Sequence, residues 1–68
     1  MNEEVLNSQI RRFLKKVGVR SQREIELAVI RSFEKSSLVG TKKLEASVLL
    51  EVPAVGIKVS IEGEIKLE

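Results

Sequence analysis

The sequence predicts an α+β fold in which two N-terminal helices pack on a C-terminal antiparallel β-hairpin, the order ααββ. Two observations carry this prediction. Apolar residues recur at helical spacing as far as Phe33, and after Thr41 they alternate with polar residues, as in strands. The chain has 68 residues, enough for one domain only, so residues 1–68 are expected to form a single α+β domain.

The first helix is expected between Asn2 and Gly18. Asn2 is a suitable N-cap, and the acidic residues Glu3 and Glu4 favour the positive end of the helix dipole. Gly18 can take the left-handed conformation that ends a helix. One apolar stripe follows from the helical period, made of Leu6, Ile10, Phe13, Leu14 and Val17.

The second helix is expected to begin at Ser21 and to end near Ser36 and Ser37. Ser21 and Glu24 form a capping-box pattern, in which each side chain reaches the backbone N–H of the other residue. The serines weaken the helix, and Gly40 lies beyond it. The expected buried stripe consists of Ile25, Ala28, Val29 and Phe33, with Ile30 at its edge.

The strands of the hairpin are expected at residues 44–52 and 57–67, each with one apolar and one charged face. A four-residue turn over Pro53–Gly56 pairs Val52 with Ile57 and places all apolar partners on one face. A two-residue turn at Pro53 and Ala54 is a competing register that the pattern leaves open.

The expected fold is small and lacks the usual supports of small folds. The chain contains no Cys and no His, which excludes disulfides, iron–sulfur clusters and zinc sites built on these side chains. A two-stranded sheet is marginal alone and has two open edges. We therefore expect a homodimer that extends the sheet to four strands. In the alternative, the chain is a monomer whose exposed apolar residues are ordinary surface residues.

Several functional classes have no support in the sequence. No apolar run approaches a membrane span, and the acidic N-terminus does not resemble a signal peptide, so a cytoplasmic protein is expected. The four glycines are dispersed and form no phosphate-binding loop or dinucleotide fingerprint. We expect no enzymatic activity, no catalytic residue, no cofactor and no metal.

The best candidate site is a basic cluster. Net charge is +2, but residues 1–43 carry +5 and residues 44–68 carry −3. Such a cluster can neutralise phosphates, although a solvated helix face is the favoured interpretation. A helix-turn-helix across Gly18–Ser21 is a weaker alternative, because there is no room for a supporting helix before Asn2. The candidate polyanion-binding residues are Arg11, Arg12, Lys15, Lys16, Arg20 and Arg23.

Carboxylates also gather on the charged face of the expected hairpin. Catalytic carboxylates need a pocket that perturbs their pKa values, and an exposed strand face supplies none. We therefore expect ordinary cross-strand ion pairs with lysines. The acidic residues concerned are Glu45, Glu51, Glu62 and Glu64, and the lysines are Lys43, Lys58 and Lys66.

The chain resembles a group of short, uncharacterised bacterial proteins that is treated as a domain of unknown function. The likeness rests on Met1–Glu3, Phe13–Val19, Ser21–Glu26 and Glu62–Ile65, and it spans nearly the whole chain. The resemblance implies a bacterial, cytoplasmic protein and carries over no activity, cofactor or binding residue. The segment Ser36–Ser37 departs from the family, in which a glycine is expected there.

Together these observations predict a non-enzymatic protein-interaction domain that forms a homodimer. Its protein partner would be engaged by strand addition at a hairpin edge or through an apolar surface patch. Binding of nucleic acid or another polyanion through the basic cluster is the alternative, and nucleic acid is the less favoured partner. No membrane partner is expected.

Overall fold

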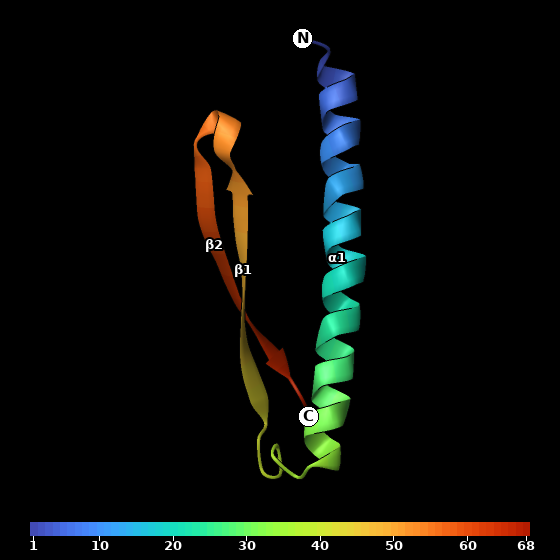
Figure 1. Cartoon of the computed structure of the whole chain (residues 1–68), viewed down its shortest axis with the longest axis vertical. Helices are drawn as coiled ribbons and strands as arrows, with labels where there is room; N and C mark the ends of the chain where they lie inside the picture. Colours follow the sequence, from blue (N-terminus) through green and yellow to red (C-terminus); the bar gives the residue numbers. More distant parts are fainter. The chain divides into compact units, whose positions relative to one another are not determined.

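The computed structural model describes all 68 residues, which divide into two compact units, Met1–Leu38 and Val39–Glu68. The first unit contains helix α1 (Glu3–Glu34). The second contains strand β1 (Lys43–Val52), the 3-10 turn η1 (Pro53–Val55) and strand β2 (Ile57–Lys66), as Figure 1 shows. The α+β class and the antiparallel hairpin are confirmed.

Helix α1 is one continuous helix of 32 residues, so the prediction of two helices was wrong. Gly18 does not end a helix, and Ser21 lies inside the helix instead of capping one. The Glu24 carboxylate accepts a hydrogen bond from the Arg20 guanidinium at 3.4 Å, one turn back along α1. The capping box is therefore absent, and Glu24 instead forms an ion pair with Arg20 on the helix surface.

The physical reason for the continuity is that Gly18 is a weak helix breaker. A glycine in a helix interior costs only about 1 kcal/mol relative to alanine. No proline occurs within Glu3–Glu34, and most residues on both sides of Gly18 have good or moderate helix propensity. A helix stop at Gly18 would forfeit several backbone hydrogen bonds, and each of these contributes about 1 kcal/mol.

Replacing Gly18 with alanine tests this continuity. We expect Gly18→Ala to raise the free energy of unfolding by about 1 kcal/mol, because alanine favours the helix and the added Cβ meets nothing within 4 Å. A glycine that ended a helix in the left-handed conformation would give the opposite sign. The measurement is urea unfolding at fixed protein concentration, followed by circular dichroism.

The matched control is the same substitution in the hairpin turn. Gly56 has φ 73°, a left-handed conformation that costs a residue with a Cβ roughly 1–2 kcal/mol. Gly56→Ala should therefore lower the free energy of unfolding while Gly18→Ala raises it. Equal destabilisation by both substitutions would contradict the continuous helix.

The two ends of α1 have defined caps. Asn2 is the N-cap as predicted, and its Oδ1 accepts from the Val5 N–H at 3.1 Å. At the C-terminal end, Ser36 N–H donates to the Phe33 carbonyl at 3.0 Å and Ser37 N–H to the Ser32 carbonyl at 2.9 Å. These two bonds form a Schellman motif. Ser36 holds its left-handed position, with φ 58°, where glycine is the favoured residue.

The hairpin has the predicted four-residue turn and the predicted register. Val52 pairs with Ile57, and the ladder continues to Lys43 opposite Lys66. In the turn, the Gly56 N–H donates to the Pro53 carbonyl at 3.1 Å, and Gly56 is left-handed. The competing two-residue turn is therefore excluded. Ala46 lies opposite Gly63, as the alternation of the sequence predicted.

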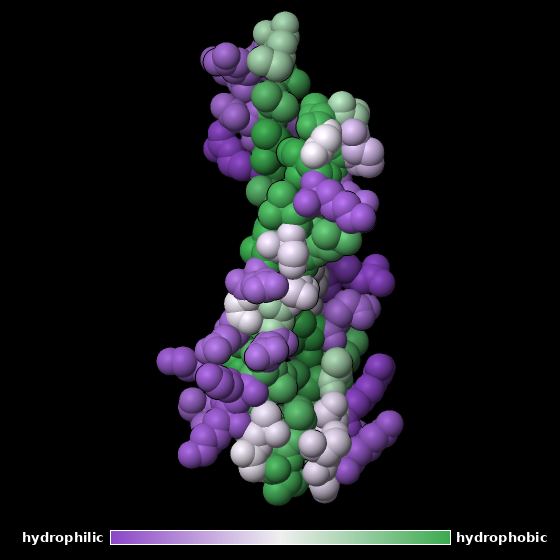
Figure 2. Space-filling view, turned by 90° about the vertical axis from the view of Figure 1, so that its left-hand side faces the viewer, coloured by the Kyte–Doolittle hydropathy of each residue, from purple (hydrophilic) through white to green (hydrophobic).

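Neither unit has a core. No residue of the chain is buried, whether hydrophobic or polar. Many large apolar side chains are more than a third exposed, and Figure 2 shows them in green at the surface among hydrophilic residues in purple. Within each unit, backbone hydrogen bonds and local side-chain packing therefore hold the elements together.

Candidate interaction surfaces

The first surface is an apolar stripe along α1, called the helix stripe below. It includes part of each stripe that was expected on a separate helix, but Phe13, Val29 and Phe33 lie outside it. Successive members are three or four residues apart, so the stripe keeps to one side of the helix over its whole length. Ile10 and Leu14 are 45% and 51% exposed. The members are Leu6, Ile10, Leu14, Val17, Ser21, Ile25, Ala28 and Ser32.

The second surface is the apolar face of the hairpin. The register brings its side chains together in cross-strand pairs such as Val48 with Ile61 and Leu50 with Val59. Val48 is 42% exposed and Ile61 is 55% exposed, which is far more than such side chains show inside a sheet-based core. The members are Leu44, Ala46, Val48, Leu50, Val52, Ile57, Val59, Ile61 and Ile65.

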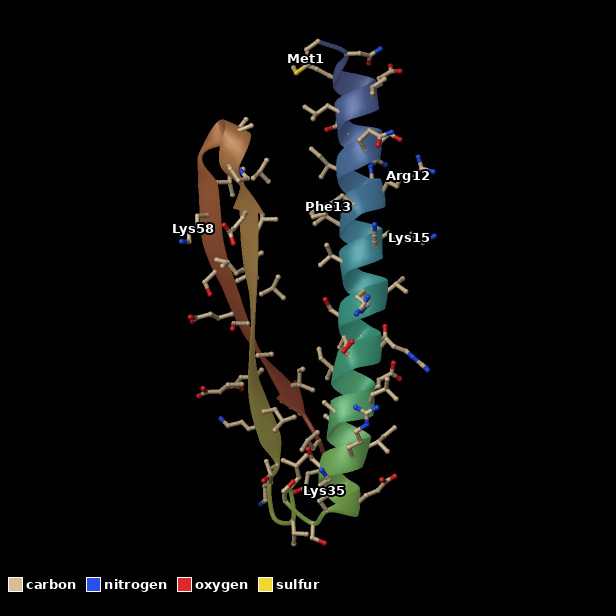
Figure 3. The ribbon with its side chains drawn as sticks, viewed as in Figure 1. Met1, Arg12, Phe13, Lys15, Lys35 and Lys58 are labelled. Carbon is tan, nitrogen blue, oxygen red and sulfur yellow. The ribbon has the colours of Figure 1, made fainter.

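The third surface is the basic arc, which holds all six predicted polyanion-binding residues. Because α1 is continuous, they lie on a single helix, within about 18 Å at about 1.5 Å of rise per residue. In Figure 3, Arg12 and Lys15 project from α1 on the side opposite Phe13. All six are exposed, and they are Arg11, Arg12, Lys15, Lys16, Arg20 and Arg23.

One member of the basic arc has an acidic neighbour. Arg20 pairs with Glu24 at 3.4 Å, and the two side chains are 78% and 61% exposed. An exposed pair of this kind contributes little to stability and leaves the guanidinium accessible. The continuous helix also removes the helix-turn-helix alternative, because Gly18–Ser21 are helical and form no turn.

The polar face of the hairpin carries an acidic patch. Glu45 lies directly opposite Glu64, and Glu62 lies opposite Ser47. Lys43 relieves part of this repulsion, because its Nζ lies 3.4 Å from Glu64 Oε1. Glu51 lies opposite Lys58, which is the expected cross-strand charge pair. The patch, together with Ala46, Ser47 and Gly63, lines a depression that is partly open to solvent.

The depression does not enclose its acidic side chains. It is open to solvent and its acidic side chains are exposed, whereas catalytic carboxylates need an enclosed environment. No group of three or more His, Cys, Asp or Glu side chains is placed to hold a metal ion. The chain also has no helix whose length and apolarity together would let it cross a bilayer.

The two edges of the hairpin form the fourth surface. The sheet contains only β1 and β2, so each strand has one side without a neighbour within its sheet. The Leu67 N–H donates to the Lys42 carbonyl at 2.8 Å, which marks 42 and 67 as a hydrogen-bonded pair. Because bonded and non-bonded pairs alternate in an antiparallel ladder, Ser47 and Ser60 belong to non-bonded pairs. Their N–H groups therefore point outward from the two edges.

Two members of the helix stripe, Ser21 and Ser32, were not predicted from the sequence; Ser21 was expected to be an N-cap. A signal for them was present. Leu6, Val17 and Ala28 are eleven residues apart, as are Ile10, Ser21 and Ser32. An eleven-residue period of apolar and small residues indicates one long helix. The expected break at Gly18 hid this period.

Comparison with known proteins gives one match. Residues 1–68 match a family described as "Family of unknown function (DUF6494)", and the chain belongs to that family. This confirms the resemblance to an uncharacterised family over the whole chain. Neither the curated proteins nor the solved structures contain a match.

Proposed function

We propose that this member of a family of unknown function is a non-enzymatic protein-interaction domain that works as a homodimer. The observation that carries the proposal is the absence of any buried residue. A folded chain that buries nothing keeps its apolar faces for a partner, because exposed apolar patches of this extent mark interaction sites. The lack of Cys and His agrees with a non-catalytic protein of the reducing bacterial cytoplasm.

The exposed apolar side chains within each unit support a dimer. On α1, Ile10 and Leu14 are 45% and 51% exposed, and on the hairpin Val59 and Ile61 are 50% and 55% exposed. Association of two copies would cover such side chains without requiring any other protein.

Sheet extension is the mode of association that the hairpin supports. Both edges expose outward N–H and carbonyl groups, and an edge strand pairs readily with another strand. Two hairpins joined at one edge would make the four-stranded sheet expected from the sequence. The same edge chemistry would capture an extended segment of a different protein by strand addition.

The experiment that tests the proposal is sedimentation equilibrium of the purified chain, with and without short duplex DNA at low salt. We expect the mass of a dimer at micromolar concentration and no change on addition of DNA. A monomer over the whole range up to millimolar concentration would overturn the homodimer.

The second candidate function is binding of a polyanion by the basic arc. It is favoured by one observation, namely that the continuous helix gathers all six cations on one exposed element. Contacts between such cations and phosphates release counterions, so binding would weaken steeply as salt is raised. In the same sedimentation experiment, this function requires a DNA complex that dissociates with salt.

A charge-reversal variant and its control distinguish DNA binding by the basic arc from weak attraction of DNA to any cation of the chain. Charge reversal at Arg11, Arg12, Lys15 and Lys16 should abolish DNA binding while the circular dichroism spectrum stays helical. Unchanged DNA binding by this variant would discard the polyanion function. Lys58, on the hairpin, provides the control, because its reversal leaves the basic arc intact.

A further inference from the structure

We propose that the helix stripe is the contact surface between two copies of α1, which pack side by side in antiparallel orientation with Val19 at the centre. The inference rests on the proposed homodimer and assigns its interface. The occupant of the stripe is thus a second copy of this chain. Four features of α1 support it.

The first feature is the period of the stripe. Its members follow one another at intervals of four, four and three residues, which is an eleven-residue repeat. A repeat of about 3.67 residues per turn keeps an apolar seam facing a partner over a long, nearly straight helix. The stripe runs from Leu6 to Ser32 and so covers nearly all of Glu3–Glu34.

The second feature is the distribution of large and small side chains. If two copies run antiparallel with a two-fold axis at Val19, each residue n lies opposite residue 38 − n of the copy. Residues whose numbers add up to 38 therefore face each other. In three of the four pairs a larger side chain then meets a smaller one, which keeps the two helix axes close together. Leu14 and Ile25 fall within one residue of facing each other. The three remaining pairs are Leu6 with Ser32, Ile10 with Ala28, and Val17 with Ser21.

Parallel packing of the two helices would not pair larger side chains with smaller ones. Each residue would face its own copy, so Ile10 would meet Ile10 while Ala28 would meet Ala28 and Ser32 would meet Ser32. The N-terminal half of the seam would be crowded, and the C-terminal half would contain gaps. A gap forfeits the dispersion contacts of the side chains that line it.

The third feature is charge. Arg11, Arg12, Lys15 and Lys16 give residues 11–19 a charge of +4 with no acid among them. In parallel packing the two clusters would lie at the same height and repel. In antiparallel packing about Val19 they are offset by about 16 Å along the axis, twice the Debye length of about 8 Å in physiological salt.

The fourth feature is length. Helix α1 has 32 residues and is about 48 Å long at about 1.5 Å per residue. The stripe from Leu6 to Ser32 spans about 39 Å of it. A second α1 therefore matches the stripe over its whole length.

Cysteine cross-linking tests the orientation, because the natural chain has no cysteine. Two variants, Ile10→Cys and Ala28→Cys, are purified separately, shown to be dimers by sedimentation, and then mixed, exchanged and mildly oxidised. We expect a covalent dimer from the mixture and none from either variant alone. In the antiparallel pair, each cysteine lies about 27 Å from its own copy, far beyond the roughly 7 Å that a disulfide tolerates between Cα atoms.

The matched control replaces Ile10→Cys by Ser8→Cys, whose side chain leaves α1 on the side opposite Ile10; a mixture with Ala28→Cys should stay uncross-linked. Covalent dimers of each single variant would show parallel packing and overturn the inference. A dimer by sedimentation without any cross-link would place the interface elsewhere, which overturns the inference and leaves the proposed homodimer standing. A monomer would overturn both. If Ile10→Cys itself dissociates the dimer, the pair Leu6→Cys and Ser32→Cys repeats the test.

Discussion

Substitution of Ile10 by aspartate should dissociate the dimer into monomers. Ile10 lies in the helix stripe and is 45% exposed in the single chain, so a carboxylate there meets water until a partner covers it. Two-fold symmetry places the change twice in each dimer, and an unpaired charge buried in an apolar contact is strongly unfavourable. We expect the dissociation constant to rise by about a hundredfold or more, since about 1.4 kcal/mol corresponds to tenfold.

The measurement is sedimentation equilibrium over a range of concentrations, with circular dichroism to establish that α1 remains helical. Ser8→Asp is the matched control, because it adds the same charge two residues away on the opposite side of the helix. The control should dimerise as the natural chain does. If Ile10→Asp leaves the mass of a dimer unchanged, the helix stripe is no part of the interface.

Substitution by proline at the hairpin edge that joins two copies should also weaken the dimer strongly. Ser47 on β1 and Ser60 on β2 both have outward N–H groups, so proline at either position removes an edge donor and spares the hydrogen bonds between the two strands. Because the dimer is symmetric, the substitution removes one edge hydrogen-bond donor from each of the two copies. At the edge that joins two copies, we expect the dissociation constant to rise about a hundredfold, and at the other edge to change little.

Ser47→Ala and Ser60→Ala are the controls, because alanine removes the hydroxyl and keeps the N–H. The comparison of the two proline variants identifies the edge in use. If both proline variants keep the dissociation constant of the natural chain, while circular dichroism shows an intact hairpin, sheet extension is wrong. The cross-linking experiment on α1 is independent of this outcome.

The hairpin could be predicted from the sequence in detail, because the signals at different levels agree. Alternating side chains set the two faces, and only a register such as Val52 with Ile57 brings the apolar members together. Pro53 and Gly56 supply the conformations that a four-residue turn needs. The remaining ambiguity concerned only the length of the turn.

Helix α1 could be predicted only in part, because its central signals are local and weak. Gly18 and the Ser21–Glu24 pattern both suggest a boundary, yet each is worth about 1 kcal/mol. Continuing backbone hydrogen bonds outweigh them, and the ends marked by Asn2 and Ser36 were found correctly. The residues of the basic arc could be listed from the sequence, because a cluster of cations is visible without knowledge of the helix boundaries, but their binding of a polyanion stays a prediction.

Because the single chain has no buried residue, the stability of this protein should depend on its concentration in the cell. A subunit whose apolar faces are covered only by a copy gains stability by mass action, so its folded fraction rises with its concentration. Newly made subunits below the dissociation constant would be open to proteases, and those above it would be protected. Halving synthesis would then lower the steady-state level by more than half. The steady-state level of such a protein should therefore be either well above the dissociation constant or close to zero.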